Sequence, residues 1–227
     1  MQRSAVVIGA RGGIGQALVE ALEDEGTYTK VHAFARPELD LTDEASIAKA
    51  ADTVAAGPPP SLVLVATGLL HEDEHGPEKS FRDLDGAWLA RTFAINAIGP
   101  ALAAKHFVPL LPKGERGIFA ALSARVGSIS DNRLGGWYGY RASKAALNQL
   151  IRTLAIETRR VNDRAIVVGL HPGTVDTRLS KPFQANVPAG QLFAPDRAAV
   201  QLLDVIDGLG VKDSGGLFAW DGTPIAP

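Results

Sequence analysis

A tyrosine and a lysine separated by four positions are the pair in this sequence best suited to proton transfer. Tyr140 and Lys144 lie in the stretch Tyr-Arg-Ala-Ser-Lys, and a helix would place both on one face. A free tyrosine has a pKa of about 10, and we expect the nearby ammonium group to lower it by stabilising the phenolate. Such a phenol exchanges protons with a carbonyl oxygen or an alcohol near neutral pH. Tyr138 has no such partner, because the residue four positions later is Ala142.

A glycine-rich segment near the N-terminus has the composition of a phosphate-binding loop. Gly9, Gly13, Ile14 and Gly15 follow a short apolar stretch and begin a helical pattern. Glycine permits a tight turn and lets backbone N–H groups approach a phosphate, and a helix N-terminus adds partial positive charge. Because the segment opens a strand–loop–helix unit, it predicts a dinucleotide-binding site rather than an ordinary turn.

Two arginines predict which dinucleotide this loop binds. The second predicted strand runs into Arg36, and Arg11 lies inside the glycine segment. NAD-binding proteins usually place an acidic residue after the second strand, whereas arginine accommodates a 2′-phosphate. The two cations therefore favour NADP(H) over NAD(H). The alternative is that both arginines are solvated surface groups.

Apolar segments alternate with helical patterns along the chain and predict the elements that position these residues. The pattern indicates an α/β fold with one doubly wound parallel-sheet Rossmann domain, residues 1–227, in three α/β/α layers. Ligands in such sheets bind at the carboxyl ends of the strands. Strands are predicted at residues 5–9, 30–35, 61–66, 117–122, 164–170 and 216–220, and helices at 13–25, 83–111, 140–159 and 195–209.

Two connecting segments differ in their expected roles. Residues 57–60 read Gly-Pro-Pro-Pro and predict a rigid turn. Residues 177–195 are rich in proline and glycine, and their lack of periodicity favours a mobile substrate loop. The alternative for 177–195 is a surface excursion without a role.

The composition excludes several classes of protein. A net charge of −2 argues against nucleic-acid binding, and the absence of cysteine excludes disulfides and thiolate chemistry. It is compatible with the cytoplasm, which we expect. No apolar run approaches the roughly 20 residues that span a bilayer. His71 and His75 flank an acidic stretch that we interpret as a solvated loop, and we expect no metal site.

Together these motifs resemble the short-chain dehydrogenase/reductase family over nearly the whole chain. The glycine spacing, Asn96, the Tyr140–Lys144 pair and Pro172-Gly173 follow the family's order. Residues 127–140 resemble the branch that contains C-factor and carbonyl reductases. The resemblance implies that Tyr140 is the general acid/base and that Lys144 lowers its pKa and holds the nicotinamide ribose. It also implies that Asn96 supports a water relay to Lys144.

The resemblance implies further cofactor contacts. Asp40 and Leu41 would line the adenine, and Gly68 is retained where the family reads Asn-Asn-Ala-Gly and this chain reads Val-Ala-Thr-Gly. Contacts with the nicotinamide and the phosphates are implied for the residues Pro172, Gly173, Thr174, Val175 and Thr177. We expect the family's helix between the second and third strands to be missing, because only a few residues separate these strands.

The family's catalytic serine has no unambiguous counterpart. Its position is occupied by Ala124. Ser123 lies one residue earlier and would face away if the strand alternation holds. Ser128 lies on the following loop, twelve residues before Tyr140. We favour Ser128 for orienting a substrate carbonyl, with Ser123 as its competitor, and the third possibility is that no serine does so.

The function implied is that of an NADP(H)-dependent oxidoreductase that transfers a hydride between nicotinamide and a small carbonyl or alcohol substrate. The alternative is an NADP(H)-binding signalling or regulatory protein with little chemistry, which Ala124 and the C-factor resemblance favour. Family members often pair through their long helices, so a homodimer or homotetramer is implied.

Overall fold

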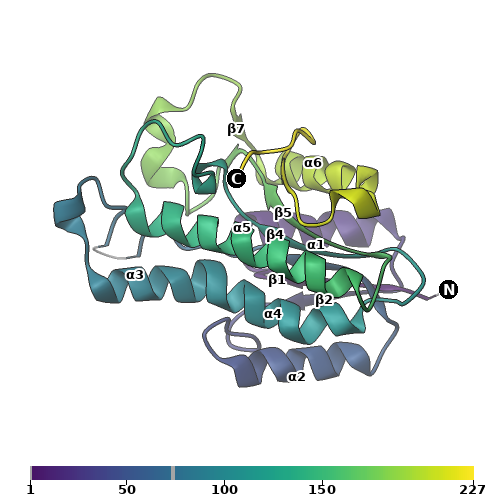
Figure 1. The fold of residues 1–227 in the computed structure, drawn as a ribbon. Helices are drawn as coiled ribbons and strands as arrows, with labels where there is room; N and C mark the ends of the chain where they lie inside the picture. Colours follow the sequence, from purple (N-terminus) through teal and green to yellow (C-terminus); the bar gives the residue numbers. More distant parts are fainter. Residues whose placement is uncertain (1, 73–74) are drawn as a thin grey trace.

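The protein folds around a parallel sheet with helices on both faces (Figure 1). The computed structural model describes residues 2–72 and 75–227. Within them, the main sheet has the strand order β2-β1-β3-β4-β5-β8, and all neighbours are parallel, which confirms the predicted fold class. Its strands are β1 (Ser4–Ile8), β2 (Lys30–Phe34), β3 (Pro60–Val65), β4 (Gly117–Leu122), β5 (Ala165–His171) and β8 (Leu217–Ala219). The α-helices are α1 (Gly13–Glu25), α2 (Glu44–Ala55), α3 (Gly86–Phe93), α4 (Gly99–Phe107), α5 (Tyr138–Arg159) and α6 (Pro195–Gly208).

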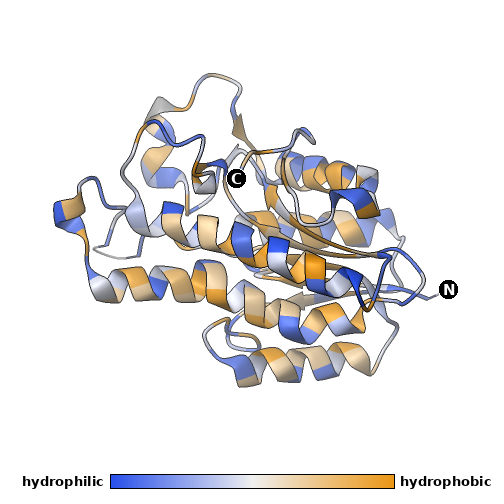
Figure 2. Cartoon of the chain, in the orientation of Figure 1, coloured by the Kyte–Doolittle hydropathy of each residue, from blue (hydrophilic) through white to orange (hydrophobic). Residues whose placement is uncertain are grey.

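Alternate side chains of each strand enter two cores, one on each face of the sheet. Val6 and Ile8 pack with residues of α2, α4 and α5, whereas Ala5 and Val7 pack with residues of α1 and α6. Strands covered on both faces must be apolar throughout. Figure 2 shows the helices with hydrophobic and hydrophilic residues side by side. Each helix turns its apolar stripe toward the sheet.

The strand order places a switch in winding beside β1. This strand pairs with β2 on one side and with β3 on the other. In open α/β sheets, ligands bind at such a switch, outside the carboxyl ends of the strands. The glycine segment after Ile8 and the Thr67-Gly68 segment after β3 therefore lie where a ligand is expected.

Helix α2 contradicts the prediction that no helix joins the second and third strands. The segment between Phe34 and Pro60 is long enough for three helical turns, and its length had been misjudged. Asp43 caps the helix by accepting a hydrogen bond from the backbone N–H of Ala45 at 3.0 Å. Buried residues then recur at helical spacing, which drives the helix onto the sheet; these are Ile47, Ala50, Ala51 and Val54.

The helix predicted over 83–111 is nearly continuous but contains a π-helical turn. Asp85 caps α3 by accepting a hydrogen bond from Trp88 N at 2.7 Å. The π turn at Ala94–Ile98 then joins α3 to α4 and includes the buried Asn96. Single π turns inside α-helices are frequent at functional sites, and this one points Asn96 at the sheet edge described below.

The segment 177–195 is anchored at both ends by a small second sheet. Strand β6 (Thr174–Val175) pairs with β7 (Leu192–Phe193). A 3₁₀ helix at Lys181–Asn186 lies between them. In the described part of the chain, none of the helices is both long and apolar enough to cross a membrane.

Candidate active site

The glycine segment wraps around the carboxyl end of β1 so tightly that side chains would not fit. Gly9 has a φ of +92°, and a Cβ there would lie 2.8 Å from Ala66 O. A Cβ on Gly15 would lie 2.1 Å from Gly9 O. Gly12 caps α1 without a side chain, and the first turn of α1 carries no acidic residue. The N-terminus of α1 is therefore an electropositive end to which an anion could bind.

The two predicted arginines lie together beside this loop. Arg11 Nη1 donates a hydrogen bond to Arg36 O at 2.8 Å, and both residues are exposed. Arg11 Nη2 also lies 3.7 Å from Glu38 Oε1. The structure thus brings both guanidinium-bearing residues to the end of β2, and it reveals a carboxylate that competes for one of them.

The segment after β5 crosses the start of α1. A Cβ on Gly13 would lie 2.8 Å from Thr177 Cγ2, so only glycine lets the two segments approach. Gly173 has a φ of +78° and packs against the ring of Phe193. The loop after Pro172 is thereby brought against the glycine loop, as its predicted role in cofactor binding requires.

Asp40 and Leu41 have mainly local roles. The Asp40 carboxylate accepts hydrogen bonds from Thr42 N at 2.8 Å and Thr42 Oγ1 at 2.7 Å, which lower its pKa. Leu41 is buried against Gly99 at the start of α4. Leu41 therefore belongs to the core that supports the adenine side of the predicted site.

The end of β3 joins the nucleotide end of the site to the chemical end. A Cβ on Gly68 would lie 3.8 Å from Lys144 Nζ and 3.9 Å from Asn96 Oδ1. The neighbouring Thr67 Oγ1 is buried and makes no hydrogen bond among the described residues. Sequence reasoning missed Thr67, although a hydroxyl in the position where the family carries alanine was a usable signal.

Tyr140 and Lys144 lie on the first turns of α5, as predicted. Lys144 is 2% exposed, and its Nζ donates a hydrogen bond to Leu122 O at 2.7 Å. The same Nζ lies 5.8 Å from the centroid of the Tyr140 ring. A Cβ on Gly127 would lie 2.8 Å from Lys144 Cβ, so a glycine there lets the loop after β4 pack on the helix.

The expected effect of Lys144 on Tyr140 was wrong in this structure. Tyr140 keeps a partly exposed surface, yet burial raises its pKa to about 12 instead of lowering it. Burial also lowers the pKa of Lys144 to about 7. Desolvation disfavours the charged form of each group. This effect is larger than the attraction between the phenolate and the Lys144 ammonium, which is directed at Leu122 O rather than at the phenol. The phenol of Tyr140 therefore keeps its proton near pH 7.

Asn96 links the end of β3 to α5. Its Oδ1 accepts a hydrogen bond from Leu69 N at 2.7 Å, and its Nδ2 donates to Leu69 O at 2.8 Å and to Ser143 Oγ at 3.1 Å. Ser143 in turn donates to Tyr140 O at 2.9 Å. Asn96 is fully buried. The amide therefore fixes the position of the helical turn that carries Tyr140 and Lys144.

Both candidate serines are occupied by other partners. Ser123 Oγ donates to Asn148 Oδ1 at 2.6 Å, one turn beyond Lys144 on α5. Ser128 Oγ accepts a hydrogen bond from Asp131 N at 3.2 Å and lies 3.4 Å from Pro227 O. The observed bonds thus show no preference for either serine as the group that orients a carbonyl.

A buried carboxylate that the sequence did not reveal lies next to this helix turn. Glu78 is 4% exposed, and both its oxygens accept from Gly139 N, at 3.2 and 3.1 Å. Because Glu78 is distant in sequence and belongs to no motif, spacing alone gave no signal for it. It contributes an acidic group to the N-terminus of α5, whose first turn has none.

The two histidines that flank the acidic stretch, His71 and His75, make ordinary contacts. His71 Nε2 lies 3.2 Å from Arg178 O, and His75 stacks on Trp88 with ring centroids 5.1 Å apart. The rest of the stretch interpreted as a solvated loop, residues 73 and 74, lies outside the described residues. Residues 2–72 and 75–227 contain no group of three or more potential ligands arranged to hold a metal ion.

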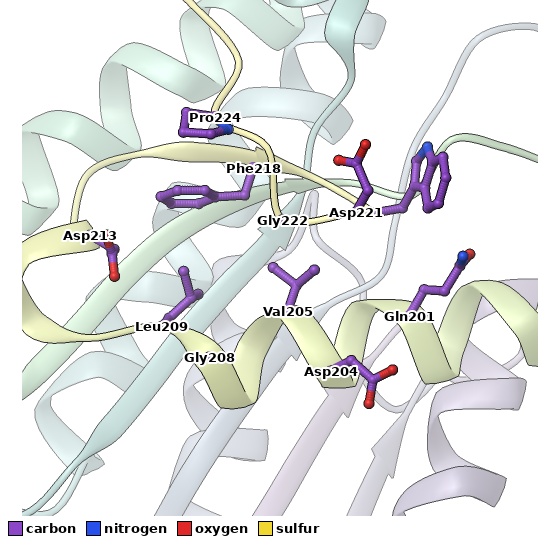
Figure 3. Close-up of a pocket in the computed structure, with 11 residues that line it drawn as sticks. Gln201, Asp204, Val205, Gly208, Leu209, Asp213, Phe218, Asp221, Gly222 and Pro224 are labelled. Carbon is purple, nitrogen blue, oxygen red and sulfur yellow. The ribbon is translucent and has the colours of Figure 1, made fainter.

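A separate groove of about 570 Å³ lies between α6 and the turn after β8 (Figure 3). Figure 3 shows Val205 of α6 and Leu209, the residue after this helix, on the side of Phe218, and Asp213 and Asp221 on the turns nearby. None of the residues predicted for nucleotide binding or proton transfer lines this groove. The residues predicted for nucleotide binding and proton transfer lie instead at the carboxyl edge of β1, β3 and β4.

An electropositive glycine loop and a tyrosine–lysine pair at one edge of a doubly wound sheet are features expected of an NAD(P)-dependent oxidoreductase. A family model described as enoyl-(acyl carrier protein) reductase matches residues 5–201. The chain is 31% identical to 1-hydroxy-2-glutathionyl-2-methyl-3-butene dehydrogenase of Rhodococcus sp. over 97% of each chain. It is 40% identical to the C-signal protein of Myxococcus xanthus over 63% of this chain and 81% of that protein. The chain belongs to the short-chain dehydrogenase/reductase family.

The solved structures agree with this assignment. The chain superposes on the NADPH-bound carbonyl reductase from chicken fatty liver with a TM-score of 0.86 and 26% identity, over 100% of this chain and 94% of that chain. It also shares its fold with the carbonyl reductase Sniffer of Drosophila melanogaster, at a TM-score of 0.81 and 24% identity over all of both chains. The match confirms the resemblance to carbonyl reductases drawn from residues 127–140.

Proposed function

We propose that this protein reduces a small carbonyl compound with NADPH and that Tyr140 supplies the proton. The observation that carries the proposal is the desolvated Tyr140 phenol, which lies on one helical face with Lys144 at the switch edge of the sheet. A phenol that holds its proton at neutral pH suits the reductive direction, in which the carbonyl oxygen gains a proton.

The residues present fit a bound NADP(H). The glycine loop offers backbone N–H groups at the α1 N-terminus, Arg11 and Arg36 suit a 2′-phosphate, and the buried Thr67 hydroxyl lacks a partner among the described residues. The bound cofactor would supply the hydride that reaches the carbonyl carbon. Carbonyl reductase structures with NADPH support this cofactor, because the chain is similar to one of them over its full length.

The side chains of this protein would transfer one proton to the substrate. As the carbonyl oxygen gains negative charge, Tyr140 donates its phenolic proton to that oxygen, and the reverse transfer occurs in alcohol oxidation. When Lys144 is protonated, its positive charge stabilises the phenolate that remains on Tyr140. Asn96 holds the turn in place through Leu69 and Ser143. The substrate loop, residues 177–195, would limit the access of water to these groups.

Replacement of Tyr140 tests the proposal. We expect wild-type protein to oxidise NADPH with at least some aldehydes or ketones, and Tyr140→Phe to lose about 10²- to 10⁴-fold in kcat/KM with the Kd for NADPH kept. Tyr138→Phe is the matched control, since it makes the same change two residues away at a side chain that is 38% exposed. Equal turnover by the two variants would show that Tyr140 is not the proton donor.

The cofactor preference has an independent test. We expect NADP⁺ to raise the thermal unfolding temperature more than NAD⁺ at equal concentration, because Arg11 and Arg36 attract the 2′-phosphate. In Arg36→Ala the difference between the two cofactors should shrink. A larger shift with NAD⁺ in the wild type would contradict the assignment and would point to Glu38, which already lies near Arg11.

A second candidate function is a sensor of NADP(H) that does little chemistry. The position of the family's catalytic serine holds Ala124, and both nearby serine hydroxyls have other partners. The similarity to a protein named C-signal also favours this candidate. A wild-type protein that binds NADPH but oxidises it with no carbonyl compound would select the sensor over the enzyme.

We also propose that the protein pairs with itself through the long helices. Exposed apolar side chains lie along them, with Ile98 at the end of the π turn before α4 51% exposed and Ile156 on α5 49% exposed. Light scattering tests this directly, because a dimer or tetramer is expected and a monomer at all concentrations would refute it.

A further inference from the structure

Three consecutive residues before the catalytic helix have left-handed backbone conformations. Gly135, Gly136 and Trp137 have φ values of +65°, +64° and +54°. Glycine adopts such angles without cost, but a bulky aromatic residue does so only under constraint. Trp137 is the single non-glycine residue with positive φ in the described part of the chain. Strained residues of this kind cluster at active sites and persist where surrounding contacts hold them.

Glu78 and Arg141 supply those contacts. Trp137 N donates to Glu78 O at 2.5 Å, and the Glu78 carboxylate accepts from Gly139 N in the next turn. Arg141 Nε donates to Gly136 O at 3.0 Å, and its Nη1 donates to Val126 O at 3.2 Å. The strained residue is therefore held from both sides, immediately before Tyr140.

The Trp137 ring lies between the catalytic tyrosine and the substrate loop. Its centroid is 6.3 Å from that of Tyr140 and 5.1 Å from that of Phe183. Phe183 in turn meets His71 at 5.8 Å. These are the separations of interacting aromatic pairs. Trp137 and Phe183 are both only half-buried, so each keeps surface that another molecule can contact.

We propose that Trp137 and Phe183 form the aromatic wall of the substrate site, and that Glu78 is the positioning residue that holds Trp137. This rests on the proposed function, because a carbonyl that reaches the Tyr140 hydroxyl must lie within about 3 Å of it. The rest of such a substrate then lies within reach of the Trp137 ring, one helical turn away. The site selects flat aldehydes and ketones.

The two cations of the first turns of α5 already have partners. Arg141 is the cation next to Tyr140 in sequence, and it already donates to two backbone carbonyls. Lys144 donates to Leu122 O. The Glu78 carboxylate is 4% exposed and bound to Gly139 N. A substrate carboxylate would find these cations occupied, whereas an aromatic ring would find ring faces to stack on.

The first test compares benzaldehyde with cyclohexanecarbaldehyde, which are similar in size but differ in flatness. The ratio of their kcat/KM values should fall about fivefold to tenfold from wild type to Trp137→Gly, mainly through KM, because stacking is lost. Intrinsic reactivity cancels when this ratio is compared between variants. Glycine is the chosen replacement because it accepts the left-handed backbone. An unchanged ratio would overturn the proposal.

Variants of Glu78 and a matched control complete this test. Glu78→Ala should lower the same ratio by removing the carboxylate that accepts from Gly139 N, and Glu78→Gln should lower it less, because its amide oxygen still accepts this bond. Both variants keep the backbone bond from Trp137 N to Glu78 O. Leu134→Ala should leave the ratio unchanged, since Leu134 is 92% exposed three residues before Trp137. Equal ratios in wild type, Glu78→Gln and Glu78→Ala would refute the positioning role of Glu78.

A binding measurement separates this inference from the proposed function. We expect 4-nitrobenzyl alcohol to quench the tryptophan fluorescence of the NADP⁺-saturated wild type. The same quenching is expected in Trp220→Phe, whereas most of it should be absent in Trp137→Gly. That result would support the wall even if no carbonyl compound were turned over. Full activity of Tyr140→Phe would instead refute the proposed function alone, and quenching retained in Trp137→Gly would refute the wall alone.

Discussion

The glycine loop after β1 and the first turn of α5 lie at the same edge of the sheet but depend on different kinds of contact. The tightest approach in the loop is between backbone atoms close in sequence, where a Cβ on Gly15 would meet Gly9 O at 2.1 Å. The α5 turn is shaped by side chains distant in sequence. Glu78 reaches Gly139 across 61 positions, and Asn96 reaches Ser143 across 47. Local motifs reveal the first kind of site, and only the fold reveals the second.

The largest expected effect comes from placing a side chain in the glycine loop. Gly15→Ala would force a Cβ against the backbone of Gly9, and we expect a loss of about 3 kcal/mol or more in the free energy of unfolding. Gly86→Ala is the control, because a Cβ there meets nothing within 4 Å. Chemical denaturation should show a large loss for the first variant and a change below about 1 kcal/mol for the second. Similar losses in both would mean that the loop is not shaped by close backbone approach.

The α5 turn should respond most to the loss of a single buried amide. In Asn96→Asp the side chain keeps its shape but no longer donates to Leu69 O or Ser143 Oγ. We expect a loss of about 3 kcal/mol in the free energy of unfolding, because two buried acceptors lose their donor. Asn132→Asp, an exposed change before α5, is the control and should cost little. A loss below about 1 kcal/mol for Asn96→Asp would contradict the role given to this amide.

The titration of Lys144 should make stability depend on pH in a defined direction. Its pKa is about 7 in the folded protein and 10.5 as the ordinary value. Between these values the unfolded chain holds a proton that the folded chain has released. The free energy of unfolding should therefore rise with pH from 7 to about 9.5, by up to about 1.4 kcal/mol per pH unit.

Lys144→Met removes this titration and serves as the comparison. The difference in unfolding free energy between wild type and Lys144→Met should grow in favour of the wild type as the pH rises through this window. Tyr140 affects stability only above its ordinary pKa of 10.0 and in the opposite sense, because its folded pKa is raised. A difference that stays constant with pH would show that Lys144 is charged in the folded protein.

The smallest expected effect isolates the strain at Trp137. Trp137→Ala and Trp137→Gly both lose the ring, but only glycine is free to adopt a φ of +54°. Trp137→Gly should therefore be more stable than Trp137→Ala by about 1 kcal/mol. Elsewhere glycine is usually the less stable of the two. Thermal or denaturant unfolding that ranks alanine above glycine at this position would refute the strain.

The sequence predicted the parts of the site that follow from local patterns. The sheet, the glycine loop and the Tyr140–Lys144 pair were identified because each has a fixed spacing. Helix α2 was missed through a misjudged connection length, although the spacing from Ile47 to Val54 was helical. Glu78 was missed because its partners are brought close only by the fold.

The direction of the Tyr140 pKa shift could not be predicted from sequence spacing either. Four residues of separation predict that Lys144 lies near the phenol, but they do not predict how much water is removed from either group. The structure shows Lys144 directed at Leu122 O and both groups desolvated. Burial therefore decides the sign of the shift.

The ionisation of Tyr140 in solution tests the central claim most directly. The near-ultraviolet absorbance of phenolate should be titrated in wild type and in Tyr140→Phe, with Tyr138→Phe as the control. We predict that the tyrosine missing from Tyr140→Phe shows no ionisation below pH 10, because burial raises its pKa to about 12. Ionisation of that tyrosine below pH 9 would contradict the claim that the Tyr140 phenol keeps its proton near neutral pH and can donate it.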